Sequence, residues 1–169
     1  AQQFPLMAAS VYASLAAHAI EILGASNFAM DYGSETSRGK TTSLMLAASL
    51  FGNPNERAYD SMFLSFDATS VGIERTAAAR NGLPLIIDET KRAGYGQAPQ
   101  MIYMLASGQG RARGTKRGVQ AVQRWKSVTI TSGEVPIVDQ SCDGGTAARI
   151  ITINKPPTPE GKAREVEKF

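Results

Sequence analysis

Apolar positions recur along the chain with two different periods, which predicts a mixture of helices and strands. Residues 5–23 have apolar side chains at three- and four-residue spacings, typical of a helix that ends before Gly24, with a stripe made of Leu6, Val11, Leu15, Ala19, Ile22 and Leu23. Short apolar runs of strand length follow at 27–32, 61–66, 83–87, 128–131 and 150–153. Between these runs the pattern predicts helices at 40–51, 70–81 and 99–105.

The run at 83–87 has no polar alternation, as expected for a strand that is buried on both faces of a parallel sheet. Because strands and helices alternate, we expect an α/β fold with three layers around a mostly parallel central sheet. Ligands of such sheets bind in the crevice at the carboxyl ends of the strands. Candidate binding residues should therefore follow the predicted strands.

The chain has 169 residues, of which 43% are hydrophobic and 20% charged, and this suffices for one globular domain with a buried core. We divide it into an N-terminal packing helix at 1–24, a core at 25–154 and a proline-rich, charged tail at 155–169. Because the sequence starts at Ala1 without a methionine, we expect it to be part of a longer protein.

Few residues could hold a structural metal. One cysteine, Cys142, and one histidine, His18, cannot assemble a zinc site of the usual Cys/His count, and a single cysteine forms no internal disulfide. The apolar stretch at 6–23 is broken by His18 and Glu21 and follows no basic residue, so we expect neither a signal peptide nor a membrane span. The sequence therefore predicts a cytoplasmic protein.

Positive charge is concentrated in one part of the chain. The segment between Glu89 and Glu134 contains none of the 15 acidic residues but includes Lys91, Arg92, Arg111, Arg113, Lys116, Arg117, Arg124 and Lys126. The rest of the chain is net negative, although the whole chain carries +3. Such a basic block favours a phosphate-rich partner such as nucleic acid, and a solvated surface is the alternative.

The sequence GSETSRGKTT lies between a predicted strand and a predicted helix. A phosphate-binding loop needs inward-facing backbone N–H groups, a lysine for the β- and γ-phosphates and a hydroxyl for Mg²⁺ where the helix begins. The usual pattern has four residues between its two glycines, and here five separate Gly33 from Gly39, so either Gly33 or Ser34 takes the first position. The candidate nucleotide-binding residues are Gly33, Ser34, Glu35, Thr36, Ser37, Arg38, Gly39, Lys40, Thr41 and Thr42.

Polar residues also follow two other predicted strands. A nucleotide-hydrolysing site needs an acid that helps to hold Mg²⁺ and a base that activates water. The apolar run LPLII ends in Asp88 and Glu89, so Asp88 and Thr41 are candidate magnesium ligands and Glu89 is the candidate base. The run SVTIT is followed by Ser132, at a position where motor ATPases place a polar side chain that senses hydrolysis.

In this order the motifs resemble those of the helicase-like P-loop proteins catalogued as domain of unknown function 927. The similar segments, from about Phe28 to Ile153, are YGSETSRGKTT, SFDATSVGIERTAA, NGLPLIIDE, YMLASGQGRARGTKRG, WKSVTITSGE and GGTAARIITI. Their order is also similar to that of the superfamily-three hexameric helicases and, more distantly, of AAA+ ATPases. The resemblance implies a P-loop NTPase fold of this kind.

By the same resemblance, the basic segment forms a hairpin that faces nucleic acid in a central pore, with Lys116 and Arg117 at its tip. Arg149 is implied as the arginine that reaches the nucleotide of a neighbouring subunit. Arg111 and Arg113 are competing candidates for that role and further candidate contacts to nucleic acid. Trp125 is expected to anchor the hairpin to the core.

Together these features predict an ATPase that uses ATP and Mg²⁺, with Lys40, Glu89, Ser132 and Arg149 as catalytic residues. We expect the helicase-like DNA translocase core of a replication system, assembled as a homo-oligomeric hexameric ring on single-stranded or duplex DNA, without a membrane partner. Two alternatives remain open. One is a nucleotide-switched regulatory or helicase-loading ATPase, and the other is a nucleic-acid-binding module with a degenerate nucleotide site.

Overall fold

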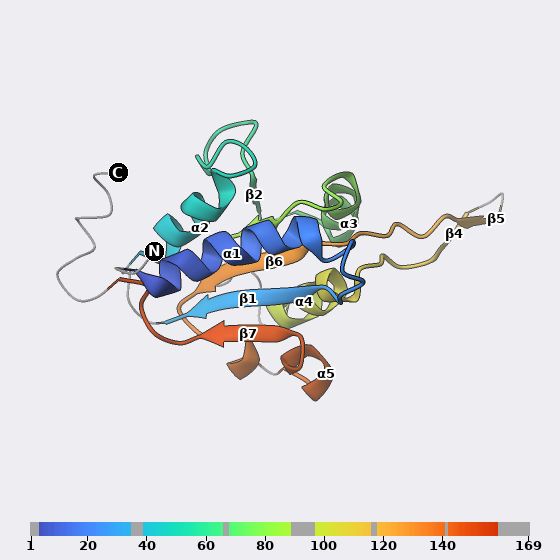
Figure 1. Cartoon of the computed structure of the whole chain (residues 1–169). Helices are drawn as coiled ribbons and strands as arrows, with labels where there is room; N and C mark the ends of the chain where they lie inside the picture. Colours follow the sequence, from blue (N-terminus) through green and yellow to red (C-terminus); the bar gives the residue numbers. More distant parts are fainter. Residues whose placement is uncertain are drawn as a thin grey trace.

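A computed structural model describes residues 4–34, 39–65, 68–88, 97–115, 118–140 and 142–158. Within them, parallel strands form a five-stranded central sheet in the order β2-β3-β6-β1-β7 (Figure 1). The bounds of these strands, in chain order, are β1 Phe28–Gly33, β2 Phe63–Leu64, β3 Leu85–Ile87, β6 Val128–Gly133 and β7 Ile150–Ile153. The predicted α/β fold with a parallel sheet is confirmed.

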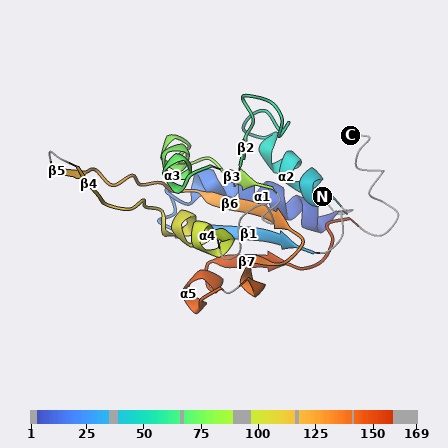
Figure 2. The ribbon, with the colours of Figure 1, turned by 180° about the vertical axis from the view of Figure 1, so that it is seen from behind.

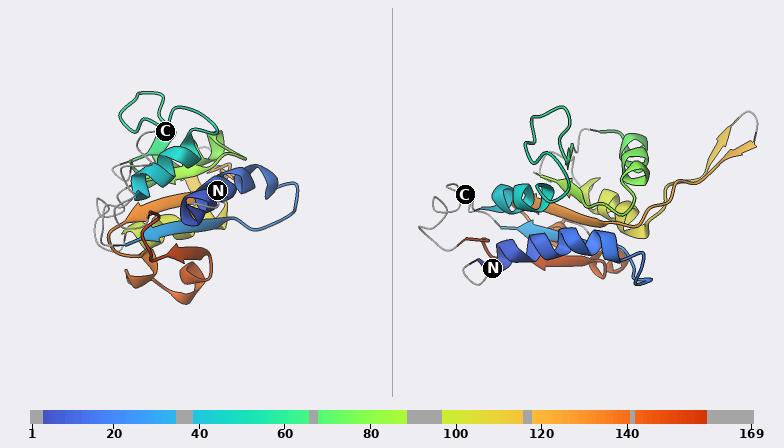
Figure 3. Two further views of the ribbon diagram at one scale, coloured as in Figure 1. Left: turned by 60° about the vertical axis from the view of Figure 1, so that its left-hand side comes forward. Right: turned by 45° about the horizontal axis from the view of Figure 1, so that its top comes forward.

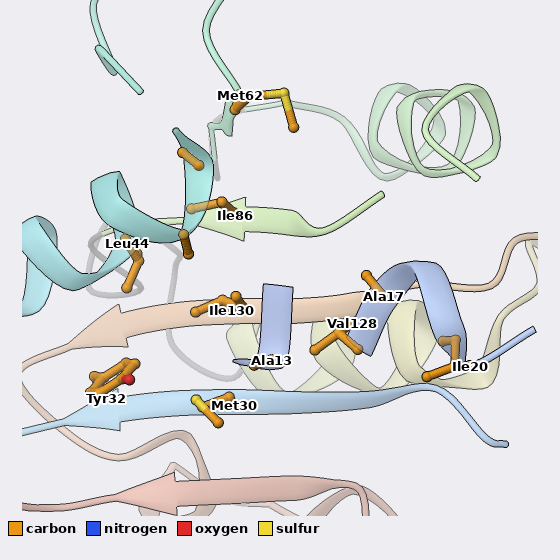
Figure 4. Packing of buried hydrophobic residues seen from close by; sticks show 12 residues of the cluster. Ala13, Ala17, Ile20, Met30, Tyr32, Leu44, Met62, Ile86, Val128 and Ile130 are labelled. Carbon is orange, nitrogen blue, oxygen red and sulfur yellow. The ribbon is translucent and has the colours of Figure 1, made fainter. Parts of the chain in front are cut away.

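Helices cover both faces of this sheet, which makes three layers. On one face lie α1 (Pro5–Ala19) and α2 (Lys40–Ala48), which share a buried cluster with alternate residues of the central strands (Figure 4). On the other lie α3 (Ser70–Ala79) and α4 (Gln97–Ser107), which is in front in Figure 2. A 3₁₀ turn, η2 (Ile137–Asp139), and a short helix, α5 (Gly144–Ala147), connect β6 to β7.

The predicted apolar stripe of the first helix is wrong in part. Leu15, Ile22 and Leu23 are exposed, and α1 ends at Ala19. The buried face instead carries small residues, because α1 lies close against α2: Ser10 Oγ donates to the Ser43 carbonyl and Ser14 Oγ to the Ala47 carbonyl, both at 2.8 Å. Larger side chains at these positions would separate the helices.

A two-stranded antiparallel hairpin extends from the body of the protein. It consists of β4 (Arg113–Thr115) and β5 (Gly118–Gln120), and it leaves the domain at the amino-terminal edge of the sheet, opposite the arrowheads of the strands (Figure 3). The end of β1 and the start of α2 lie at the other, carboxyl-terminal edge (Figure 1). The two predicted functional regions are therefore at opposite ends of the sheet.

Most predicted elements exist with shifted ends. The strand predicted at 61–66 is reduced to the two residues of β2, and the helix predicted at 99–105 begins earlier, at Gln97. No helix among the described residues is both long and apolar enough to cross a bilayer. The tail predicted at 155–169 is described as far as Thr158, which is fully buried.

Candidate functional site

The loop after β1 starts at the carboxyl edge of the sheet. Gly33 is the last residue of β1 and pairs with Gly133, and a Cβ on Gly33 would lie 2.4 Å from the Pro136 Cα, so no other residue fits there. The Ser34 backbone N–H donates to the Gly133 carbonyl at 3.2 Å. Gly33 thus belongs to the strand, and Ser34 is the first residue beyond it. The candidate residues Glu35, Thr36, Ser37 and Arg38 lie outside the described residues.

The same loop ends at the beginning of α2. Gly39 has a φ of +80°, a left-handed conformation that glycine adopts most readily, and precedes the first helical residue, Lys40. Its carbonyl accepts hydrogen bonds from the backbone N–H and the hydroxyl of Ser43. Thr41 is exposed in the first turn and Thr42 is half-buried. The first turn of α2 contains no acidic residue. The positive end of the helix dipole lies at this turn and favours an anion.

Lys40 is the cation of this loop. Its side chain is 9% exposed, and Nζ donates a hydrogen bond to the Ser34 carbonyl. Burial lowers the pKa of Lys40, and the opposing charges of Glu134, Asp88 and Asp31 raise it. The lysine is therefore held across the loop, close to three carboxylates.

Asp88 and Ser132, which were predicted separately, are brought together. In the parallel register Ile87 pairs with Thr131, so the residues that follow each of them are neighbours at the strand ends. Ser132 Oγ donates a hydrogen bond to Asp88 Oδ1. Glu89, the predicted base, lies outside the described residues.

Asp31 is a further carboxylate of this region that the sequence reasoning missed. It is fully buried in β1, where Oδ1 accepts from Thr131 Oγ1 at 2.9 Å and Oδ2 from the Ile137 N–H at 2.8 Å. Burial is the main cause that raises its pKa from 3.8 to about 6, against the lowering effect of these hydrogen bonds and of Lys40. An aspartate within the apolar run FAMDY was the available signal.

The described residues at the two ends of the loop are compatible with a bound phosphate. Ser34 Oγ is buried and has no hydrogen-bond partner among the described residues, so a polar atom beside the loop still needs one. No group of three or more His, Cys, Asp or Glu side chains in the described part of the chain is placed to hold a metal. Mg²⁺ needs only one or two protein ligands beside phosphate oxygens and water, and Thr41 and Asp88 provide oxygen donors of that kind.

Arg149 lies at the opposite edge of the sheet. Its carbonyl accepts from the Ala29 N–H at 2.8 Å, where β1 and β7 begin, and its guanidinium lies 5.2 Å from the ring centroid of Tyr103. The guanidinium also donates to the Gly145 carbonyl. Arg149 is therefore at the other end of the strands from the loop of its own chain, and its action on a neighbouring subunit stays a prediction.

The hairpin residues differ from one another in their surroundings. Arg111 is exposed, whereas Arg113 forms two hydrogen bonds with the Glu74 carboxylate, and Lys116 and Arg117 lie outside the described residues. Trp125 is 3% exposed, packs in the core and donates through Nε1 to the Leu105 carbonyl at 2.9 Å. Its predicted anchoring role is confirmed.

The parallel sheet, the start of α2 after Gly39 and the acidic end of β3 define a P-loop NTPase-like fold. Residues 2–125 match the family described as domain of unknown function (DUF927), and the chain belongs to this family. The solved structure titled "SCCmec type IV Cch - active helicase" is similar, with a TM-score of 0.76 and 24% identity over 98% of this chain. The chain spans 31% of that solved chain. A search of curated proteins found no match.

Proposed function

We propose that this domain is the ATP-hydrolysing core of a helicase-like nucleic-acid motor. The observation that carries the proposal is the group of Lys40, Asp88 and Ser132 at the carboxyl edge of the sheet. The family and the helicase fold support it. We further propose DNA as the substrate and a replication system as the setting.

The loop residues and Asp88 bind the nucleotide and its metal ion. Backbone N–H groups from Glu35 to Thr42 hold the phosphates, and the Lys40 ammonium offsets charge on the β- and γ-phosphates. Thr41 and Asp88 hold Mg²⁺. When bound, Mg²⁺ neutralises phosphate charge and makes the γ-phosphorus more electrophilic.

The residues beyond the loop act on the attacking water. Glu89 accepts its proton as the water adds in line to the γ-phosphorus and the bond from that phosphorus to the β-γ bridging oxygen breaks, which releases ADP and phosphate. Ser132 fixes the orientation of the Asp88 carboxylate through its hydrogen bond. Arg149 stabilises the transition state at the nucleotide of a neighbouring subunit in a hexameric ring. Its position supports this role, because it lies where β7 begins, at the opposite end of the strands from the phosphate loop of its own chain.

The hairpin supplies the nucleic-acid contacts. It projects from the amino edge of the sheet, exposed Arg111 precedes its first strand, and Lys116 and Arg117 come between its two strands in the sequence. Neutralising Lys116 and Arg117 together should therefore flatten the dependence of single-stranded DNA affinity on salt concentration by up to about 1.4 units of slope.

Two substitutions test the chemistry. Glu89→Gln should abolish ATP turnover and leave ATP binding largely intact, whereas Lys40→Ala should lose ATP binding. The measurements are phosphate release and equilibrium binding of a fluorescent ATP analogue. Turnover at the parent rate in Glu89→Gln would show that another group is the base.

A further inference from the structure

Glu74 of α3 is a buried carboxylate at the base of the hairpin. Its side chain is 1% exposed, and Arg113 donates to it through both terminal nitrogens, Nη1 to Oε2 at 2.7 Å and Nη2 to Oε1 at 2.9 Å. The backbone of Arg111 also favours the ionised form of this carboxylate. These bonds, with Arg113 first among them, hold the pKa of Glu74 below its ordinary value.

The backbone at Gly110 lies close to the Glu74 carboxylate. A Cβ added at Gly110 would lie 2.7 Å from Glu74 Oε2, so the chain passes directly over the carboxylate. The planar fork of an arginine matches a carboxylate with two parallel bonds, and lysine cannot reproduce this geometry. A buried carboxylate that loses such a partner is strongly unfavourable.

The position of Arg113 makes this pair an anchor. Arg113 is the first residue of β4 and pairs with Gln120 across the hairpin. Closer to the domain, the segments before β4 and after β5 are joined by two backbone hydrogen bonds. The Gly110 N–H donates to the Gln123 carbonyl at 2.8 Å, and the Trp125 N–H donates to the Gly108 carbonyl at 2.9 Å. These bonds hold the two segments to each other, whereas the pair with Glu74 holds the segment that contains Arg113 to α3.

The charge pattern explains why the partner comes from another element. The segment between Glu89 and Glu134 contains no acidic residue, so a carboxylate for Arg113 has to come from elsewhere in the chain. Glu74 supplies it from α3, where Ile73 and Ala77 pack in one cluster with Leu85 and Ile87 of β3. The anchor therefore connects the hairpin to the strand that precedes Asp88.

We propose that Glu74 is a positioning residue that fixes the direction of the basic hairpin through Arg113, and that Arg113 anchors the hairpin and does not contact nucleic acid. The effect on nucleic acid rests on the proposed function, whereas the effect on the direction of the hairpin does not.

A distance measurement tests the positioning by itself. In a Cys142→Ser background, spin labels at Gln120 and Ser49, both exposed, report the position of the hairpin relative to α2 by pulsed electron resonance. The distance distribution should be narrow in the parent and broader in Glu74→Gln and Arg113→Gln. Arg111→Gln, which leaves the Glu74–Arg113 pair intact, is the matched control and should stay narrow. Equal widths in all four proteins would overturn the proposal.

Single-stranded DNA binding in a salt titration gives the second readout. Glu74→Gln, Arg113→Gln and the double variant should all lose affinity for single-stranded DNA by the same factor, about tenfold. The slope of their affinity against salt concentration should equal that of the parent. Arg113→Lys, which keeps the charge and one hydrogen bond, should fall between them and the parent. If Arg113→Gln alone lowers the slope by about 0.7 while Glu74→Gln leaves it unchanged, Arg113 contacts phosphate and the anchoring role is wrong.

The two readouts separate the two proposals. If the parent protein binds no DNA, the proposed function is refuted. If the distance distribution still broadens in Glu74→Gln and Arg113→Gln, the positioning role of Glu74 is supported all the same. If Glu74→Gln does not fold, Arg113→Lys still tests the anchor, because broadening is expected when one of the two hydrogen bonds is lost.

Discussion

Ser132 Oγ donates a hydrogen bond to Asp88 Oδ1 across the neighbouring strands β6 and β3. The two residues are 44 positions apart in the sequence, and the parallel register alone brings them together. The negative charge of Asp88 reaches Lys40, where it opposes the lowering of the lysine pKa by burial. The pair therefore joins the acidic strand end to the phosphate loop.

Removing the Ser132 hydroxyl should slow hydrolysis. A hydrogen bond to a charged group is worth about 1.5–3 kcal/mol, so Ser132→Ala should reduce kcat by about 10- to 100-fold and leave ATP affinity largely unchanged. Ser127→Ala is the matched control, because Ser127 bonds to the Leu83 carbonyl near the other end of the same strand. Equal kcat values for the two variants in a phosphate-release assay would contradict the role of Ser132.

Gly39 should tolerate substitution less well than Gly24. Both glycines have a positive φ, and an alanine in the left-handed region costs about 1–2 kcal/mol. A Cβ on Gly24 meets nothing within 4 Å, but one on Gly39 would lie 2.9 Å from the methyl group of buried Thr158. Gly39→Ala should therefore lower the free energy of unfolding in urea by more than Gly24→Ala.

The contact with Thr158 also provides a rescue. Thr158→Ser removes the methyl group, so it should restore part of the stability lost in Gly39→Ala and none of that lost in Gly24→Ala. Urea unfolding of the two double variants measures this difference. Equal rescue in both backgrounds would show that the strand end and tail at 150–158 do not constrain the start of α2.

The buried carboxyl of Asp31 should make stability depend on pH. Its pKa is about 6 in the folded chain and 3.8 in the reference state, so the folded state favours the protonated form. The resulting stabilisation is complete below pH 4 and is lost as the pH rises through 6, by about 3 kcal/mol in all. Asp31→Asn stays neutral, so its stability relative to the parent should rise over this interval in urea unfolding. A constant difference would contradict the raised pKa.

Arg149 should act between subunits. Arg149→Ala and Glu89→Gln should each be inactive, since an arginine supplied in trans is worth about a thousandfold or more in rate. Mixing them should restore part of the activity, because some interfaces then combine an intact Glu89 with an intact Arg149. Exposed Arg124 provides the control, and Arg124→Ala should stay active alone. No recovery in a co-assembled mixture would exclude Arg149 as the trans residue.

The strands could be read from the sequence because short apolar runs flanked by polar residues allow few other structures. The run at 150–153 was predicted with the bounds that β7 has, and β1 is displaced by one residue. The strand order explains how Asp88 and Ser132 meet, and their separate predictions already pointed to this edge of the sheet.

Side-chain partners were less predictable, because they depend on packing between distant elements. The buried face of α1 carries Ser10 and Ser14, whose polarity hides it from a hydrophobic pattern until their bonds to α2 are known. Likewise, a count of charges places Arg113 in a basic block, but only the packing of α3 shows that Glu74, 39 positions away, is its partner. The burial of Asp31 depends in the same way on Thr131 and Ile137.

The rate of ATP hydrolysis with and without single-stranded DNA tests the motor function most directly. We predict measurable hydrolysis by the parent protein, an increase when single-stranded DNA is added, and none in Lys40→Ala under either condition. A DNA-independent rate would favour a nucleotide-switched protein. No hydrolysis by the folded parent at any protein or DNA concentration would contradict the proposed ATPase.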